Sequence, residues 1–229
     1  MPAQYRRHSQ RKAITIILAK YFDYHVTKTD CWLSSVSLAS SILTHSRQQT
    51  RYSHMDNTND QIGPHSMLAA ADLRHVDLQG VNLYEADLRG SKLSDTNLSG
   101  ADLAGANMTS ADLTRCQLSG SDLSGADLSG ANLSNANLTS ANLTNANLTG
   151  ANLTEANLSQ SNLYLANFTN ATLVKANLLR ANRAYAHRTY VNFSYANLSG
   201  ANLTDCRLDG DLTETIFTDA VTTGTIFDV

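Results

Sequence analysis

The residues best suited to binding chemistry gather in the stretch 178–193, which reads LLRANRAYAHRTYVNF. Guanidinium and phenol groups are enriched at binding hot spots because they combine hydrogen bonds with a large contact area. The candidate partner-binding residues are Arg180, Arg183, Tyr185, His187, Arg188 and Tyr190. Catalysis would need paired titratable groups that converge on a substrate, and the chain shows neither convergent carboxylates nor a nucleophile motif. We therefore expect a binding protein without enzymatic activity.

Four histidines near the start of the chain raise the question of a metal site. They are His8, His25, His45 and His54, and their successive spacings of 17, 20 and 9 match no pattern of metal ligands. The chain also lacks a glycine motif that would cradle a phosphate group. We expect neither a bound metal nor a cofactor.

A five-residue repeat must position these groups. Residues 126–158 read ADLSG ANLSN ANLTS ANLTN ANLTG ANLTE ANL, so Ala, then Asn or Asp, then Leu precede two small polar residues. A period of five fits neither a straight helix nor a straight strand. Ala and Leu are two residues apart, so they share one side of a short extended piece while Asn or Asp points away. The pattern predicts a coil that turns at every unit, with Ala and Leu inside and the next coil about 4.8 Å away.

The long tandem of A(N/D)LXX units resembles the pentapeptide repeat proteins of bacteria, which are abundant in cyanobacteria. The resemblance implies an all-β fold, a right-handed quadrilateral parallel β-helix with four units per coil. The phase holds from Ser66 to Gly210, which at five residues each makes 29 units, and with the tail we expect about eight coils. No proline interrupts this run, as a laddered backbone requires.

Four units per coil would stack each residue on its equivalent four units later. Opposite charges then adjoin at Asp95 and Arg115 and at Glu155 and Lys175, and Lys175 would lie under Tyr195. Exposed pairs of this kind contribute at most about 1 kcal/mol. The stability must therefore come from the Leu and Ala core and from the backbone ladders.

Arginine or cysteine replaces a core residue at four places. Arg183 and Arg188 fall on the Leu position, where an unpaired buried charge would be prohibitive, so the backbone must bulge or the arginines must reach solvent. A tolerated irregular coil without a partner is the alternative interpretation. Cys116 and Cys206 fall on the Ala position of different faces, too far apart for a disulfide, and act as small apolar residues.

The chain divides into a basic arm, residues 1–62, and the repeat region, residues 63–229, which is irregular at 178–193. Residues 1–54 carry eight Lys or Arg and two acids, which gives a net charge of +6. Residues 55–229 carry nine Lys or Arg and eighteen acids, which gives a net charge of −9. We expect the arm to be poorly ordered or partly helical. The alternatives are contact with an anionic membrane surface or translation from Met55.

The basic run at 6–12 and the apolar run at 13–19 outline a signal peptide, but no convincing cleavage site follows. We expect the bacterial cytoplasm, with the periplasm or thylakoid lumen as the alternative.

The end of the chain predicts a contact between copies. After Gly210 the phase slips by one residue, within 210–215, and three last units follow without a polar cap. An open solenoid end must be covered or paired. We expect a twofold end-to-end homodimer through Ile216, Phe217, Ile226, Phe227 and Val229.

The function expected from the sequence is a scaffold or protein-interaction module whose partner is unknown. Some bacterial members of the family resemble duplex DNA and protect type II topoisomerases by binding them. That alternative needs a stripe of acids, whereas the acids before residue 130 fall on every face. A scaffold held on a membrane by the basic arm is the third alternative, and no direct contact with nucleic acid is expected.

Overall fold

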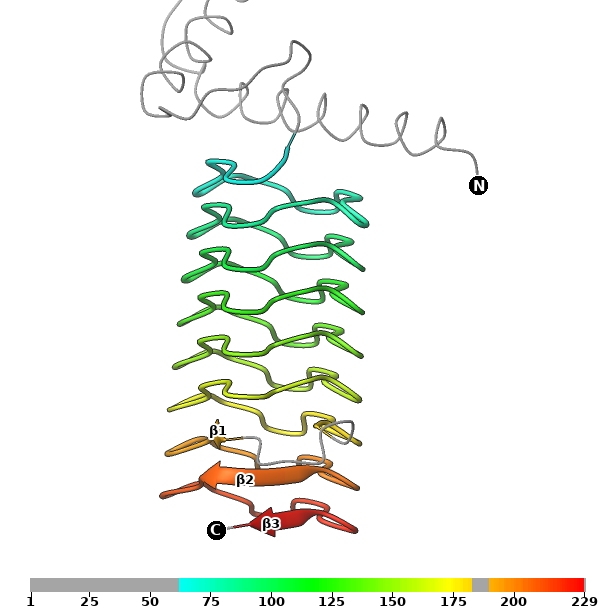
Figure 1. Ribbon diagram of the computed structural model, residues 1–229, viewed down its shortest axis with the longest axis vertical. Helices are drawn as coiled ribbons and strands as arrows, with labels where there is room; N and C mark the ends of the chain where they lie inside the picture. Colours follow the sequence, from blue (N-terminus) through cyan, green and yellow to red (C-terminus); the bar gives the residue numbers. More distant parts are fainter. Residues whose placement is uncertain (1–61, 183–189, 229) are drawn as a thin grey trace, which may run out of the picture.

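The computed structural model describes residues 62–182 and 190–228. Residues 1–61 of the basic arm, Val229 and four of the candidate binding residues lie outside the described residues; these four are Arg183, Tyr185, His187 and Arg188. The described part is a stack of coils without helices, shown in Figure 1. No helix in these two ranges is long and apolar enough to cross a membrane.

Each five-residue unit is a short extended piece followed by a tight turn. The N–H of Ala71 donates to the carbonyl of Leu68 at 3.0 Å and closes such a turn. The third residue of the turn has a left-handed backbone, with a φ of 57° at Ala70 and 61° at His75, as a type II turn requires. The Asn or Asp before Leu stabilises the turn: Asn82 Oδ1 accepts the N–H of Tyr84 at 2.9 Å. Asn and Asp suit this position because their short side chains can bond the backbone two residues on.

Successive coils are joined by parallel backbone bridges between equivalent residues four units apart, such as Met67 and Asp87. Leu73 N–H donates to the Lys92 carbonyl at 2.8 Å across one such step. The bridges form four ladders, which we number in chain order. Ladder 1 contains Met67, Asp87, Asn107, Asp127, Asn147, Asn167, Asn192 and Asp211; ladder 2 runs from Asp72 to Ile216; ladder 3 runs from Asp77 to Val221; and ladder 4 includes Asn82, Asp102, Asp122, Asn142, Asn162, Arg207 and Ile226. The turn after each ladder is called the corner of that number.

The core is a column of leucines and alanines, as the repeat predicts. Leu73 through Leu203 at the Leu position and the alanines two residues before them are almost wholly buried. Phe168 and Phe193 replace Leu on successive coils and stack, with ring centroids 4.8 Å apart. Cys116 and Cys206 are free and buried in place of Ala, which confirms their predicted role.

Three short strands form where the register changes, near the C-terminal end of the stack (Figure 1). They are β1 (Val191–Asn192), β2 (Arg207–Asp211) and β3 (Ile226–Asp228), parallel and in the order β1-β2-β3. β2 runs straight through the position where a corner would stand. Asn192 therefore pairs with Asp211, one residue short of four full units.

The preceding coil has the opposite irregularity. Asn167 bridges to Asn192, five units later instead of four, although the repeat phase in the sequence is unbroken. The described ladder residues therefore pair one unit further apart across this interval than elsewhere. The expected stacking of Lys175 under Tyr195 is wrong for this reason: the N–H of Lys175 donates to the carbonyl of Ser199, which places Lys175 beside Gly200.

Candidate binding surface

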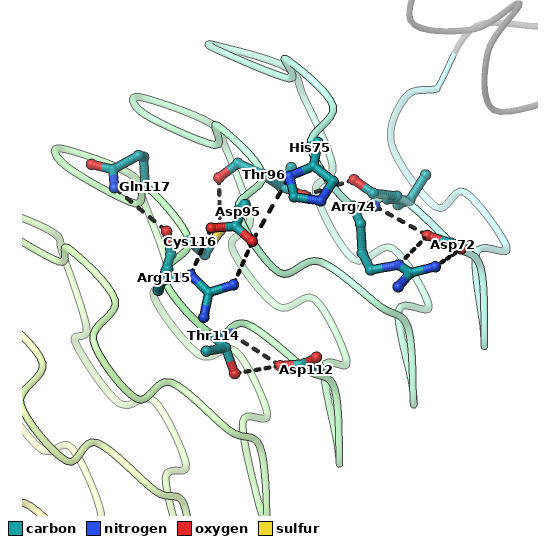
Figure 2. A network of polar contacts seen from close by, with 11 residues as sticks. Asp72, Arg74, His75, Asp95, Thr96, Asp112, Thr114, Arg115, Cys116 and Gln117 are labelled. Atoms are coloured by element: carbon teal, nitrogen blue, oxygen red, sulfur yellow. Dashed lines mark hydrogen bonds and ion pairs between the residues drawn. The ribbon is translucent and has the colours of Figure 1, made fainter.

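The first coils carry a network of charged side chains around corner 2, shown in Figure 2. Arg115 binds Asp95 in a bidentate pair, with Nε to Oδ1 at 2.8 Å and Nη2 to Oδ2 at 2.7 Å. The predicted stacking of these residues is thereby confirmed. His75 Nδ1 lies 3.8 Å from Asp95 Oδ2 on the other side. The hydrogen bond from Arg115 holds the pKa of Asp95 below its usual range. This network joins three successive coils and neutralises its own charge.

The acids of the N-terminal half do not form one stripe. Asp77 lies on ladder 3, Asp87 and Asp127 on ladder 1, and Asp102 and Asp122 on ladder 4. Several of the acids are engaged by arginine of the same or the next coil, in the pairs Asp72 with Arg74, Asp87 with Arg89 and Asp95 with Arg115. Ion pairs of acids and arginines are thus distributed over several faces of the rod.

The middle of the rod is covered by neutral amides and hydroxyls that bond one another. Asn162 Nδ2 donates to Asn142 Oδ1 at 3.1 Å, and Asn142 Nδ2 donates to Asp122 Oδ1 at 3.0 Å. Thr154 Oγ1 donates to Asn152 Oδ1 at 2.7 Å within its own unit. Much of the hydrogen-bonding capacity of these side chains is already used, so this surface mainly supports the stack.

Asn182 marks the point where the chain leaves the ladder. Its backbone φ is 58°, in the left-handed region, whereas no other described ladder residue has a positive φ. Asn is one of the few residues that tolerate this conformation. Its side chain takes over the bridge: Oδ1 accepts the N–H of Leu163 at 2.6 Å, and Nδ2 donates to the carbonyl of Arg207 at 3.4 Å. The buried amide of Asn182 therefore joins the neighbouring coils where the bridge spacing changes.

Two of the predicted binding residues lie within the described ranges, beside this interruption. Arg180 is half-exposed and its Nε lies 3.5 Å from Asp205 Oδ2. Tyr190 is 52% exposed, with a φ of 48°. Arg180 lies on corner 3 and Tyr190 on corner 4, so they border the same face of the rod.

Sequence reasoning missed two residues of this region, Leu165 and Tyr195. Leu165 is 44% exposed with a φ of 58°, and Tyr195 is 57% exposed with a φ of 57°. In the described ranges, Leu165, Tyr190 and Tyr195 are the large apolar residues that combine exposure with a left-handed backbone. The signal was available, because nearly every other unit places Gly or a polar residue at this turn position.

The last described coil places apolar residues where other coils have Asn or Asp. Ile216, Val221 and Ile226 occupy ladders 2, 3 and 4 and are 47%, 49% and 50% exposed. Phe217 and Phe227 take the Leu position and meet edge to face, with centroids 6.0 Å apart. The isoleucines thus face sideways from the rod, and the phenylalanines close its end.

Parallel ladders built from five-residue units around a Leu and Ala core define a β-solenoid. The family described as Pentapeptide repeats (8 copies) matches residues 66–103, 91–130, 116–154, 131–170, 161–182 and 189–228. The chain belongs to the pentapeptide repeat family. No curated protein sequence matches it.

Solved structures of pentapeptide repeat proteins resemble the chain. HetL, involved in heterocyst differentiation regulation in Nostoc sp. strain PCC 7120, is 29% identical over 82% of this chain and 96% of its own, with a TM-score of 0.30. Rfr23 from Cyanothece 51142 is 34% identical over 51% of this chain and 64% of its own, with a TM-score of 0.31. QnrB1, a plasmid-mediated fluoroquinolone resistance protein, is 18% identical over 72% of this chain and 94% of its own, with a TM-score of 0.32.

Proposed function

We propose that the chain is a non-enzymatic scaffold that binds a protein partner where the ladder is interrupted. The binding residues are Arg180, Arg183, Tyr185, His187, Arg188 and Tyr190. The change of bridge spacing from four units to five, at the pair Asn167 and Asn192, carries the proposal. The interval between these two residues overlaps the stretch 178–193, which is rich in Arg and Tyr. Such side chains are enriched at binding hot spots.

The scaffold is a right-handed, four-sided helix of about eight coils. Ladder 1 supports this coil number, because its bridges connect eight successive residues from Met67 to Asp211. A core filled by Leu and Ala side chains supports a structural role over a catalytic one. We place the scaffold in the bacterial cytoplasm, with the periplasm or thylakoid lumen as the alternative.

Mimicry of DNA receives less support from the charge pattern. A duplex mimic needs acids in a continuous stripe along the rod. Here Asp72, Asp87 and Asp95 pair with arginines, and the other acids are divided among the ladders. A membrane-bound scaffold depends on the basic arm, outside the described residues.

The scaffold also pairs with a second copy through its last coil. Ile216, Phe217, Ile226, Phe227 and Val229 form the proposed contact. The exposure of Ile216, Ile226 and Phe227 supports it, because exposed apolar edges of a solenoid are normally covered.

Capture of partners from a lysate of the source cells tests the binding site. The full chain, a form without residues 1–54, and a variant with Arg183→Leu and Arg188→Leu serve as baits. Lys92→Leu, an exposed residue on ladder 2 among the first coils, is the matched control. We expect a partner that the full chain and the Lys92 variant retain and the double variant loses. A partner held equally by the double variant would overturn the proposed site, and recovery of topoisomerase subunits would favour mimicry.

A further inference from the structure

Leu165 and Tyr190 lie one above the other at corner 4, on successive coils. The bridge of Asn167 to Asn192 spans five units here, and the N–H of Asn192 donates to the carbonyl of Ala166 at 3.0 Å. The same spacing leads from Leu165 to Tyr190, and both backbones are left-handed. Adjacent coils are separated by about 4.8 Å, so the two exposed side chains, each two residues before a bridged partner, occupy neighbouring positions of corner 4.

Tyr195 lies at the other end of the same face, at corner 1. Its N–H donates to the carbonyl of Thr213 at 2.8 Å, which places Glu214 at the equivalent turn position one coil below. Asp211 lies one coil below Asn192 on the ladder between the two corners. Glu214 and Asp211 are both exposed. An exposed phenol thus stands next to two carboxylates.

The described residues of the face around Tyr195 include no Lys or Arg. In the part of the chain that the structure describes, neither Lys nor Arg occurs on ladder 1 or on corners 4 and 1 from Asp127 onward. A cation placed over Tyr195 would gain a cation–π contact and an ion pair with Glu214. Exposed apolar groups beside the carboxylates of Asp211 and Glu214 are complementary to a partner that carries a cation and an apolar side chain.

The left-handed backbones strengthen this assignment. A residue with a Cβ at positive φ costs about 1 kcal/mol relative to Gly, and an exposed apolar side chain gains nothing from the fold. Other units place Gly or, with few exceptions, a polar residue at this position, as at Gly125 and Gly130 on the same two corners. The fold requires the left-handed backbone at each turn but does not require an exposed Leu or Tyr there, so these side chains point to a role at a binding surface.

We propose that this surface, formed by Leu165, Tyr190, Tyr195, Asp211 and Glu214, binds a basic protein segment that carries an apolar anchor. The anchor packs on Leu165 and Tyr190, and a Lys or Arg of the partner lies between Tyr195 and Glu214. The inference rests on the proposed function as an interaction scaffold and adds the chemistry of the partner.

Fluorescence anisotropy with three labelled peptides tests the proposal on the full chain. The peptides are (Lys-Leu-Gly)3, (Glu-Leu-Gly)3 and (Lys-Ser-Gly)3. We expect the first to bind, and the other two to bind about tenfold more weakly, because one lacks the cation and the other the anchor. Failure of the first peptide to bind, or equal binding of all three, would overturn the proposal.

Variants locate the binding. Leu165→Asn and Glu214→Gln should each weaken the first peptide about fivefold, a loss of the size expected for one apolar or cation–π contact. Glu155→Gln, the same chemical change at an exposed turn position of corner 2, is the control and should leave binding unchanged. Equal binding by the Glu214 and Glu155 variants would contradict the site. The two proposals fail separately, because the lysate capture with the Arg183 and Arg188 variant tests the proposed function, whereas the peptide series on the natural chain tests this surface.

Discussion

Gly210 lies against the backbone of Val191, at the centre of the change in register. A Cβ on Gly210 would meet the Val191 nitrogen at 2.8 Å and its carbonyl carbon at 2.9 Å, and would come closer still to the carbonyl oxygen. The backbone of Gly210 is not left-handed, so close approach is the reason for glycine here. The contact lets β2 run straight beneath β1 and removes one residue from the coil.

Gly210→Ala should therefore destabilise the rod by about 3 kcal/mol, because backbone atoms cannot move aside as a side chain can. Gly80→Ala is the matched control: a Cβ there meets nothing within 4 Å, and only its left-handed φ of 64° is unfavourable. We expect a loss of about 1 kcal/mol for the control. Urea unfolding followed by circular dichroism measures both. Equal losses would show that Gly210 tolerates a side chain.

Leu165→Asn should stabilise the isolated rod by about 0.5–1 kcal/mol, since Asn adopts a left-handed backbone more readily than Leu. The change also removes an exposed apolar side chain. Leu163→Asn, two residues earlier and fully buried, should instead destabilise by about 3 kcal/mol. Thermal unfolding of the two variants gives the comparison. A lower melting temperature for Leu165→Asn would mean that Leu165 supports the fold.

The thiols of Cys116 and Cys206 should be inert in the native protein. Burial raises the pKa of each to about 12, and only the thiolate reacts with disulfide reagents. In a Cys31→Ser chain at pH 8, we expect no reaction with Ellman's reagent until the protein is unfolded, when two thiols should appear. Fast reaction of either thiol in the native protein would show that the coil around it opens.

Acid should weaken the contact between the coils that carry Asp95 and Arg115. The folded-state pKa of Asp95 is lowered, first by the hydrogen bond from Arg115. The pair therefore stabilises the fold above the unfolded pKa of Asp, about 3.9, and this contribution is lost as pH falls through the lower folded value. Asp95→Asn should be less stable than the natural chain at pH 7, and the difference should vanish near pH 2. A difference independent of pH would assign the effect to packing.

The natural chain should be a dimer if its last coil pairs with a second copy. Light scattering coupled to size-exclusion chromatography should give twice the mass of 24.8 kDa. Ile216→Thr with Ile226→Thr keeps β-branched residues on the ladders while removing apolar contact area, and it should yield the monomer. Met67→Thr, an exposed ladder residue at the opposite end of the described stack, is the control and should leave the dimer intact. A monomeric natural chain would refute the contact.

Much of the rod follows from five-residue units taken one at a time. Leu at one position and Ala two residues earlier share a side, so the core and the places of Cys116 and Cys206 could be predicted from the sequence. The pair of Asp95 and Arg115 followed from the expectation that every fourth unit stacks. Arg180 and Tyr190 were predicted as candidate binding residues because their types are unusual for the repeat, and this assignment stays a prediction.

Only the tertiary structure decided which units pair across coils. Arg183 and Arg188 predict an irregular coil, but the phase of the repeat continues through Asn182, so the sequence pattern cannot show that the bridges there span five units instead of four. The left-handed backbone of Asn182 accompanies a register lengthened by one unit, and the close contact of Gly210 with Val191 then shortens it by one residue. These shifts bring Leu165 over Tyr190 and Tyr195 over Glu214. The physical reason is that side-chain periodicity sets the conformation of each unit, whereas hydrogen bonds between coils select its neighbours.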